Sequence, residues 1–82
     1  MNDRYEVGYR LPGRIYDLDR HCNKKAEAFA AAARLAARIR EETDPETVGI
    51  VYDRYAHPRR PDGWAVQPDG SAVCFSHRPE VA

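Results

Sequence analysis

Long apolar runs are absent from this sequence, and so are the usual signs of a cofactor site. No stretch approaches the roughly 18 consecutive apolar residues that a membrane-spanning helix needs. No glycine-rich phosphate loop is present, so no cofactor is expected. No apolar segment follows Met1–Arg4, so we expect no signal peptide and a cytoplasmic protein that does not associate with a membrane.

An excess of charge of one sign is lacking as well. The 82 residues include 13 basic and 13 acidic side chains, so the formal net charge is zero. Non-specific nucleic-acid binding depends on a clear positive excess that neutralises phosphates, and we therefore expect no tight binding to generic nucleic acid. Arginine outnumbers lysine by 11 to 2, a bias associated with GC-rich genomes, which indicates a bacterium or its phage.

Cysteine is scarce. Cys22 and Cys74 are too few for a disulfide scaffold, and in a reducing compartment we expect free thiols. We expect Cys74 to be buried or half-buried in a strand and Cys22 to be exposed ahead of a helix. His21-Cys22 and Cys74-x-x-His77 contain zinc-ligand types, but they do not form the two paired halves of a structural site, so we predict no metal.

An alanine-rich helix is predicted from Asn23 to Glu42. Asn23 is a good N-cap, and Asp44-Pro45 stops the helix because a residue before proline avoids the helical region. At helical periodicity, one arc of roughly 160° contains Phe29, Ala32, Ala33, Leu35, Ala36 and Ile39. The opposite side carries Glu27, Arg34, Arg38 and Glu41. We expect the apolar arc to pack against a sheet.

The segment before the helix alternates between apolar and polar residues. Tyr5 to Leu11 reads as a strand, Pro12-Gly13 as a turn, and residues 15–18 as a second extended run. A hairpin would pair Tyr9 with Tyr16 and Val7 with Leu18. Two-residue hairpins prefer turn types that Pro-Gly does not adopt, so a longer loop or one bent strand is the alternative.

Three strands are predicted after the helix. Val48 to Tyr52 is apolar on both faces, as in a central strand. Trp64 to Val66 and Ala72 to Phe75 flank the turn signal Pro68-Asp69-Gly70. We therefore predict a single α+β domain over residues 1–82, with a flexible tail from about residue 77. Its antiparallel sheet has three to five strands, and one helix lies across it after the first one or two strands.

Catalytic signatures are weak. The residue types of a triad occur together near the end of the chain, as Ser71 or Ser76 with His77 and Asp69. No nucleophile elbow carries them. Asp17 and Asp19 would share one face of a strand, but solvated aspartates near a helix start are the commoner case. We predict that the protein is not an enzyme, with a small toxin-like hydrolase as an alternative.

The segment from Arg54 to Trp64 is the best candidate for a binding site. Arginine, tyrosine and tryptophan are enriched in interface hot spots, and the same side chains stack bases and hold phosphates. The predicted partner-binding residues are Arg54, Tyr55, His57, Arg59, Arg60 and Trp64. The alternative is an RNA- or DNA-binding module that uses this loop and a sheet face.

The order of these parts is similar to that of several small phage-encoded anti-CRISPR proteins. The shared layout is a strand with Tyr16-Asp17-Leu18, the helix around Ala28–Ala37, the strand Val48–Tyr52, a polar loop and a hairpin, over about Arg14 to Val66. The resemblance implies a non-enzymatic inhibitor that occupies a site on a host defence complex. We expect the protein to be a monomer or a homodimer. It assigns no functional residue. The implied partner is a larger protein or ribonucleoprotein.

Overall fold

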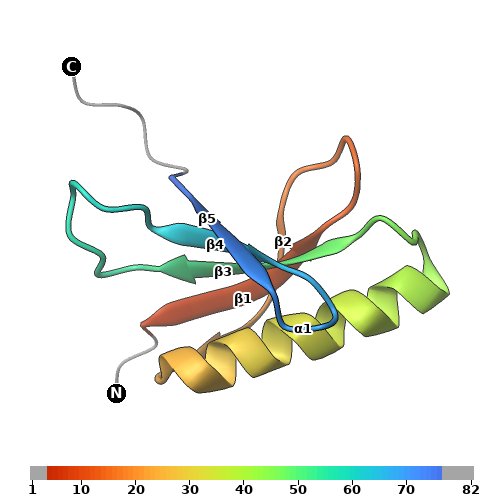
Figure 1. Ribbon diagram of the computed structural model, residues 1–82, viewed down its shortest axis with the longest axis horizontal. Coiled ribbons are helices and arrows are strands. Elements are labelled where there is room, and N and C mark those ends of the chain that lie inside the picture. Colours follow the sequence, from red (N-terminus) through yellow and green to blue (C-terminus); the bar gives the residue numbers. More distant parts are fainter. Residues whose placement is uncertain (1–3, 77–82) are drawn as a thin grey trace.

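The computed structural model describes residues 4–76, which form one helix and five strands (Figure 1). The elements are β1 (Tyr5–Arg10), β2 (Asp17–Cys22), α1 (Lys25–Glu42), β3 (Val48–Asp53), β4 (Gly63–Val66) and β5 (Ala72–Phe75). The strands form one antiparallel sheet in the order β2-β1-β3-β4-β5. The predicted α+β fold with one helix packed on an antiparallel sheet is therefore confirmed. The predicted tail lies outside the described residues.

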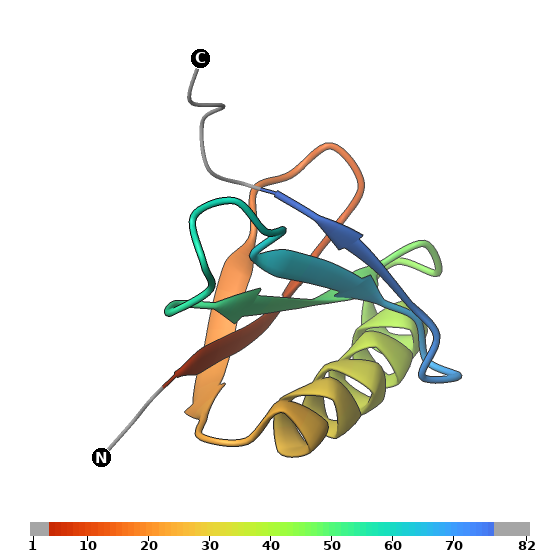
Figure 2. The same ribbon diagram turned by 60° about the vertical axis from the view of Figure 1, so that its left-hand side comes forward.

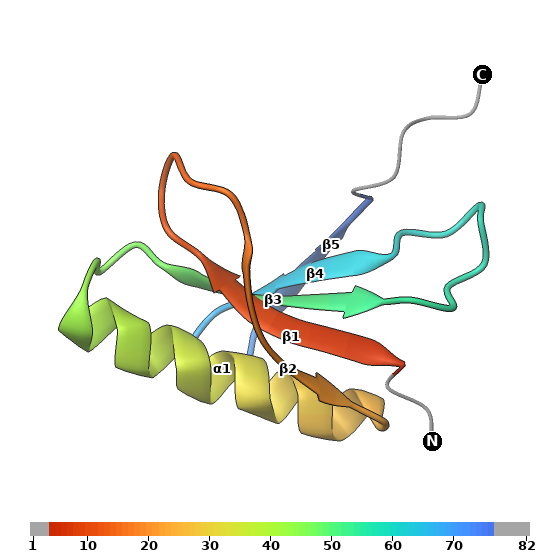
Figure 3. The same ribbon diagram turned by 180° about the vertical axis from the view of Figure 1, so that it is seen from behind.

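Helix α1 covers one face of the sheet, while the loop between β1 and β2 rises on the opposite side (Figure 2, Figure 3). Strands β1 and β3 lie at the centre, and α1 connects the β1–β2 hairpin to β3. No helix within residues 4–76 has the length and apolarity that crossing a membrane requires.

The main core lies between α1 and the face of the sheet that it covers, which we call the helix face. Strand residues Val7, Val51 and Val66 are fully buried there. The buried helix residues are Ala28, Ala31, Ala32, Leu35, Ala36 and Ile39. The predicted packing of the helix is thus confirmed, but its buried stripe also includes Ala28 and Ala31. Phe29 and Ala33 lie at its margin and are only partly buried.

Small residues let α1 approach β3 closely. A Cβ atom at Gly49 would overlap the backbone carbonyl of Ala32. Because the helix and the strand meet through a glycine and an alanine, their backbones lie nearer to each other than larger side chains would allow.

The start of α1 differs from the prediction. The N-cap is Lys24, which makes no side-chain capping hydrogen bond, so the predicted cap at Asn23 is wrong. Strand β2 continues to Cys22, and the chain needs Asn23 and Lys24 to turn from the strand into the helix. The helix ends at Glu42 as predicted.

The β1–β2 connection is a longer loop rather than a two-residue turn. The Arg14 N–H donates to the Leu11 carbonyl at 3.0 Å, and Gly13 adopts a φ of 72°. The predicted Tyr9–Tyr16 and Val7–Leu18 pairs are wrong. The structure instead pairs Tyr9 with Asp17, Gly8 with Leu18 and Val7 with Arg20. Asp19 is the extra residue of a β-bulge, a feature that bends a strand and changes the direction of its side chains.

Both cysteines are free, and their burial is the reverse of the expectation. Cys74 is exposed because it lies on the short edge strand β5, away from the helix. Cys22 is half-buried and packs against the main core.

Candidate functional site

Asp53 fixes the base of the β3–β4 loop, which we define as residues 54–62. Arg4 donates to its two carboxylate oxygens from Nε at 2.9 Å and from Nη2 at 3.0 Å. The Tyr55 N–H donates to the same carboxylate at 3.0 Å. The Asp53 N–H donates to the Asp62 carbonyl at 2.8 Å, so both ends of the loop are held by one residue.

Burial alone raises the pKa of the Asp53 carboxyl, whose side chain is only 9% exposed. Together, the hydrogen bonds from Arg4 and from the Tyr55 N–H and the positive charges of Arg4 and Lys25 outweigh burial and favour the ionised form. The pKa of Asp53 therefore lies below its ordinary value. At neutral pH the loop base is an ionised carboxylate held by several donors.

The first loop residue continues this pairing. The Arg54 N–H donates to the Arg4 carbonyl at 2.9 Å. The Arg54 guanidinium lies 3.9 Å from the Glu6 carboxylate. Arg54 is thus partly engaged within the chain.

The tip of the loop is a turn with outward side chains. The Arg60 N–H donates to the His57 carbonyl at 2.9 Å, and the Arg59 N–H donates to His57 Nδ1 at 3.1 Å. The side chains of Arg59 and Arg60 are exposed, and Tyr55 is 62% exposed. The loop therefore presents a ring and two guanidinium groups to solvent.

Trp64 is separate from this exposed surface. It lies in β4 on the helix face, opposite Val51 in the pairing of β3 with β4. Its ring packs edge-on against Phe29 with centroids 5.3 Å apart, and the Lys25 ammonium lies 4.8 Å from its centroid. Trp64 is half-buried and contributes to the helix–sheet contact.

The face of the sheet opposite α1, the outer face, carries a row of aromatic rings that sequence reasoning missed. Tyr16 and Tyr52 meet edge-on with centroids 4.9 Å apart, and Tyr52 and Phe75 meet at 5.8 Å. Gly8 and Gly63 make room for this row, since a Cβ at either position would collide with the ring of Tyr16 or Phe75. The alternation of side chains in β3 and β5 indicates that Tyr52 and Phe75 share this face. Tyr16 lies in an irregular loop, so the periodicity of the sequence does not predict its position.

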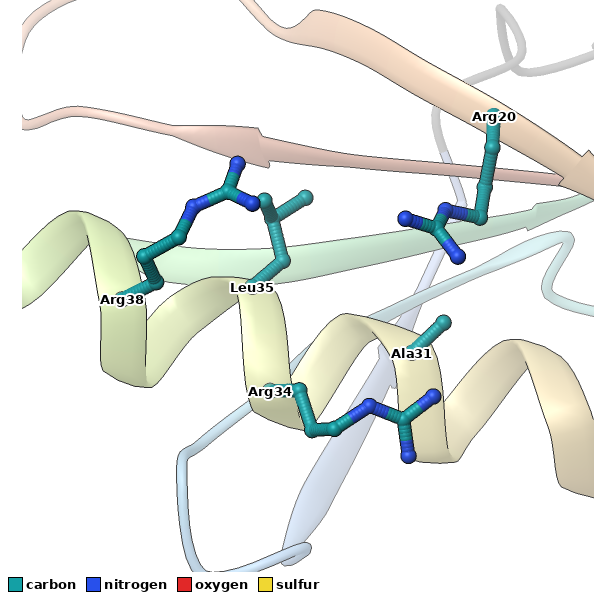
Figure 4. A pocket seen from close by; sticks show the side chains of 5 residues that line it. All are labelled: Arg20, Ala31, Arg34, Leu35 and Arg38. Atoms are coloured by element: carbon teal, nitrogen blue, oxygen red, sulfur yellow. The ribbon is translucent and has the colours of Figure 1, made fainter.

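The second missed feature is a hollow between β2 and α1, which we call the arginine hollow (Figure 4). Its volume is about 210 Å³, and it is lined by Arg20, Ala31, Arg34, Leu35 and Arg38. Arg34 and Arg38 are one turn apart in the sequence, a visible signal. Arg20 joins them only through the bulge, which the sequence does not reveal.

Two of the residues suspected of catalysis, Asp69 and Ser71, bond to each other within a turn. Both the N–H and the hydroxyl of Ser71 donate to the Asp69 carboxylate, at 2.9 and 2.7 Å, within the β4–β5 turn. His77 lies outside the described residues. Across residues 4–76, no three His, Cys, Asp or Glu side chains gather as a metal site would require.

Five of the six predicted site residues lie in or at the ends of one anchored loop, and Trp64 lies elsewhere. No family model matches the chain, and no curated protein or solved structure matches it significantly. Three surfaces within residues 4–76 are candidates for a binding site: the loop, the aromatic row and the arginine hollow.

Proposed function

We propose that the protein is a non-enzymatic binding protein that uses the β3–β4 loop to occupy a site on a larger protein or ribonucleoprotein. The observation that carries this proposal is the exposure of Tyr55, Arg59 and Arg60 on a loop whose two ends are fixed at Asp53. An exposed ring beside exposed guanidinium groups is the composition of an interface hot spot.

The anchoring lowers the cost of binding. A loop that must be ordered on association loses affinity, and a loop already held in place loses less. The bonds to Asp53 hold its base, and Pro58 and Pro61 restrict the backbone of its tip. Arg59 and Arg60 can then each present a planar fork of donors to a carboxylate or a phosphate of the partner.

The partner that we propose is a cytoplasmic host defence complex, with the protein as a phage- or mobile-element-encoded inhibitor of the anti-CRISPR kind. Support comes from the layout that the chain shares with those proteins over about Arg14 to Val66. The neutral charge favours occlusion through specific contacts rather than electrostatic imitation of a nucleic acid.

The test is a plaque assay in hosts that carry characterised CRISPR systems, with a phage that each system normally restricts. Expression of the protein should restore plaques in at least one host. Arg59→Glu with Arg60→Glu should abolish this protection while hardly changing the melting temperature, because exposed charges carry little stability. If no host is affected, the proposal of an anti-CRISPR inhibitor is wrong.

The matched control is Arg34→Glu with Arg38→Glu, which makes the same charge change on the helix. These residues are exposed and lie on α1, away from the loop (Figure 1). Protection should persist in this variant. If the helix variant loses protection and the loop variant keeps it, the contact surface is the helix.

A second candidate function is RNA or DNA binding, and the aromatic row favours it. Rings on an open sheet face are the usual stacking surface for unpaired bases. Tyr16, Tyr52 and Phe75 are half-buried rather than enclosed on this face. Their edge-to-face contacts with one another favour a packed cluster over separate stacking positions, which is why we rank this function second.

A further inference from the structure

Three arginine side chains from two elements line the arginine hollow. Arg20 reaches it from β2, and Arg34 and Arg38 reach it from α1. In Figure 4 the Arg20 guanidinium points toward the helix, and Arg38 extends beside Leu35 toward the sheet. Ala31 and Leu35 are buried and form an apolar floor.

The bulge in β2 determines which charge enters this space. Arg20 stands opposite Val7, a core residue of the helix face. Without the extra residue, Asp19 would take that position and would bring a carboxylate toward the helix. The bulge therefore adds a positive side chain to a site that already holds two.

The charges of the hollow are incompletely balanced within the chain. Arg20 Nε donates to the Asp19 carboxylate at 2.9 Å. Within residues 4–76, Arg34 and Arg38 form no ion pair and no side-chain hydrogen bond. Their i,i+4 spacing places like charges on one side of α1, which is unfavourable for the helix unless an anion balances them. Three guanidinium groups less one carboxylate leave a formal excess of two positive charges.

We propose that the arginine hollow binds a phosphomonoester group. A phosphomonoester carries a charge of about −1.5 to −2 near pH 7 and three strong acceptor oxygens, which match the excess charge and the three forks of donors. A carboxylate or a phosphodiester carries only a single charge. The hollow is smaller than the roughly 300–1,000 Å³ of a typical small-molecule site, so it receives the charged end of a ligand.

The test is calorimetric titration of the full chain with three probes that share this chemistry. They are inorganic phosphate, adenosine 5′-monophosphate and a 5′-phosphorylated oligonucleotide, with the 5′-hydroxyl oligonucleotide as the reference. The terminal phosphate should tighten binding of the oligonucleotide about tenfold or more, as charge-assisted hydrogen bonds imply. Comparison of the three probes shows whether the group is recognised alone or as part of a nucleotide or a strand end.

Arg34→Gln with Arg38→Gln should remove this preference. The control is Arg59→Gln with Arg60→Gln, which changes the net charge equally and leaves the hollow intact, so it should keep the preference. Melting curves of both variants test whether they are folded. Arg20→Gln, which removes the charge contributed by β2, should also weaken binding of the phosphorylated oligonucleotide. Equal binding of the two oligonucleotides, or an equal loss in the loop variant, would overturn the proposal. Neither result bears on the plaque assay, which tests the loop.

Discussion

A single carboxylate, Asp53, joins the segment before β1, the end of β3 and the β3–β4 loop. Its ion pair with Arg4 spans residues far apart in the sequence and is bidentate, the stronger form of such a contact. Since the pKa of Asp53 lies below its ordinary value, the folded state binds this proton less readily than the unfolded chain does. The stability that the Asp53 carboxylate contributes is therefore fully present above the pKa of this carboxyl in the unfolded chain. It is lost as the pH falls through the lower pKa of the same carboxyl in the folded protein.

We expect Asp53→Asn to lower the melting temperature by several degrees at pH 7. At a pH well below about 3.9, the pKa of an aspartate in the unfolded chain, both proteins carry a neutral side chain at position 53. The difference between their melting temperatures should therefore be smaller there. Thermal melts monitored by circular dichroism at the two pH values measure this. Asp19→Asn is the control, because its pair with Arg20 is more exposed and local. A pH-independent deficit in Asp53→Asn would show that the carboxylate acts through packing rather than charge.

The two thiols should react at different rates. Burial, followed by the charge of Glu27, raises the pKa of Cys22, although Arg20 and Arg34 oppose the shift. Cys74 is exposed on the edge strand. Since the thiolate is the reactive form, alkylation of the native protein should modify Cys74 first. Peptide mass spectrometry after timed iodoacetamide treatment measures the order, and faster labelling of Cys22 would contradict its half-buried position.

At the level of the elements, the contact between α1 and the sheet holds the domain together. Leu35 and Ile39 are its large buried helix side chains. Truncation of either residue to alanine should cost about 2–5 kcal/mol, whereas Arg34→Ala should cost less than about 0.5 kcal/mol. Chemical denaturation measures these free energies. Similar losses for Arg34→Ala and Ile39→Ala would mean that a different face of the helix packs on the sheet.

The close approach of α1 to β3 gives a second prediction. In Gly49→Ala the new methyl group would overlap the Ala32 carbonyl, so the helix or the strand must move. Gly13→Ala is the matched control. A methyl group at position 13 would meet no other atom, so the substitution is opposed only by the left-handed φ of this residue. Such a conformational cost is roughly 1 kcal/mol. Chemical denaturation of Gly49→Ala should therefore show a larger loss of unfolding free energy than this. If Gly49→Ala lost less than Gly13→Ala, the helix would be free to shift along the strand.

Across the whole molecule, equal numbers of positive and negative charges are unevenly placed. Arg59 and Arg60 lie on the loop, while Arg20, Arg34 and Arg38 surround the hollow. Such local clusters in a neutral chain favour particular ligands over a general attraction to polyanions.

A random 5′-hydroxyl single strand should therefore bind weakly at about 0.15 M salt, where the field of exposed charges is screened beyond roughly 8 Å. Fluorescence anisotropy over a range of salt concentrations measures this. Any binding at low salt should weaken with a slope near −0.7 per phosphate contact. Sub-micromolar affinity at about 0.15 M salt would favour the nucleic-acid function over the protein partner.

The amino-acid pattern by itself determined the fold class, the helix with its packing at Leu35 and Ile39, and the three strands that follow it. Local periodicity and turn residues suffice for these features, because each element's buried face repeats along a short stretch of chain. The composition of the segment between two predicted strands also identified the loop as a surface that carries arginines and a tyrosine. This composition did not separate Trp64 from that surface, because an aromatic residue beside a turn suits a core and a contact surface equally.

Only the tertiary structure decided the register of β2, the burial of the cysteines and the two surfaces that the pattern missed. Register depends on which side chains meet across strands, and a single bulged residue at Asp19 moves Arg20 to the helix face. Cys74 is exposed because its strand became an edge beyond the reach of α1, which no local pattern states. The arginine hollow exists because residues 20, 34 and 38 line a common space only when the sheet and the helix are packed together.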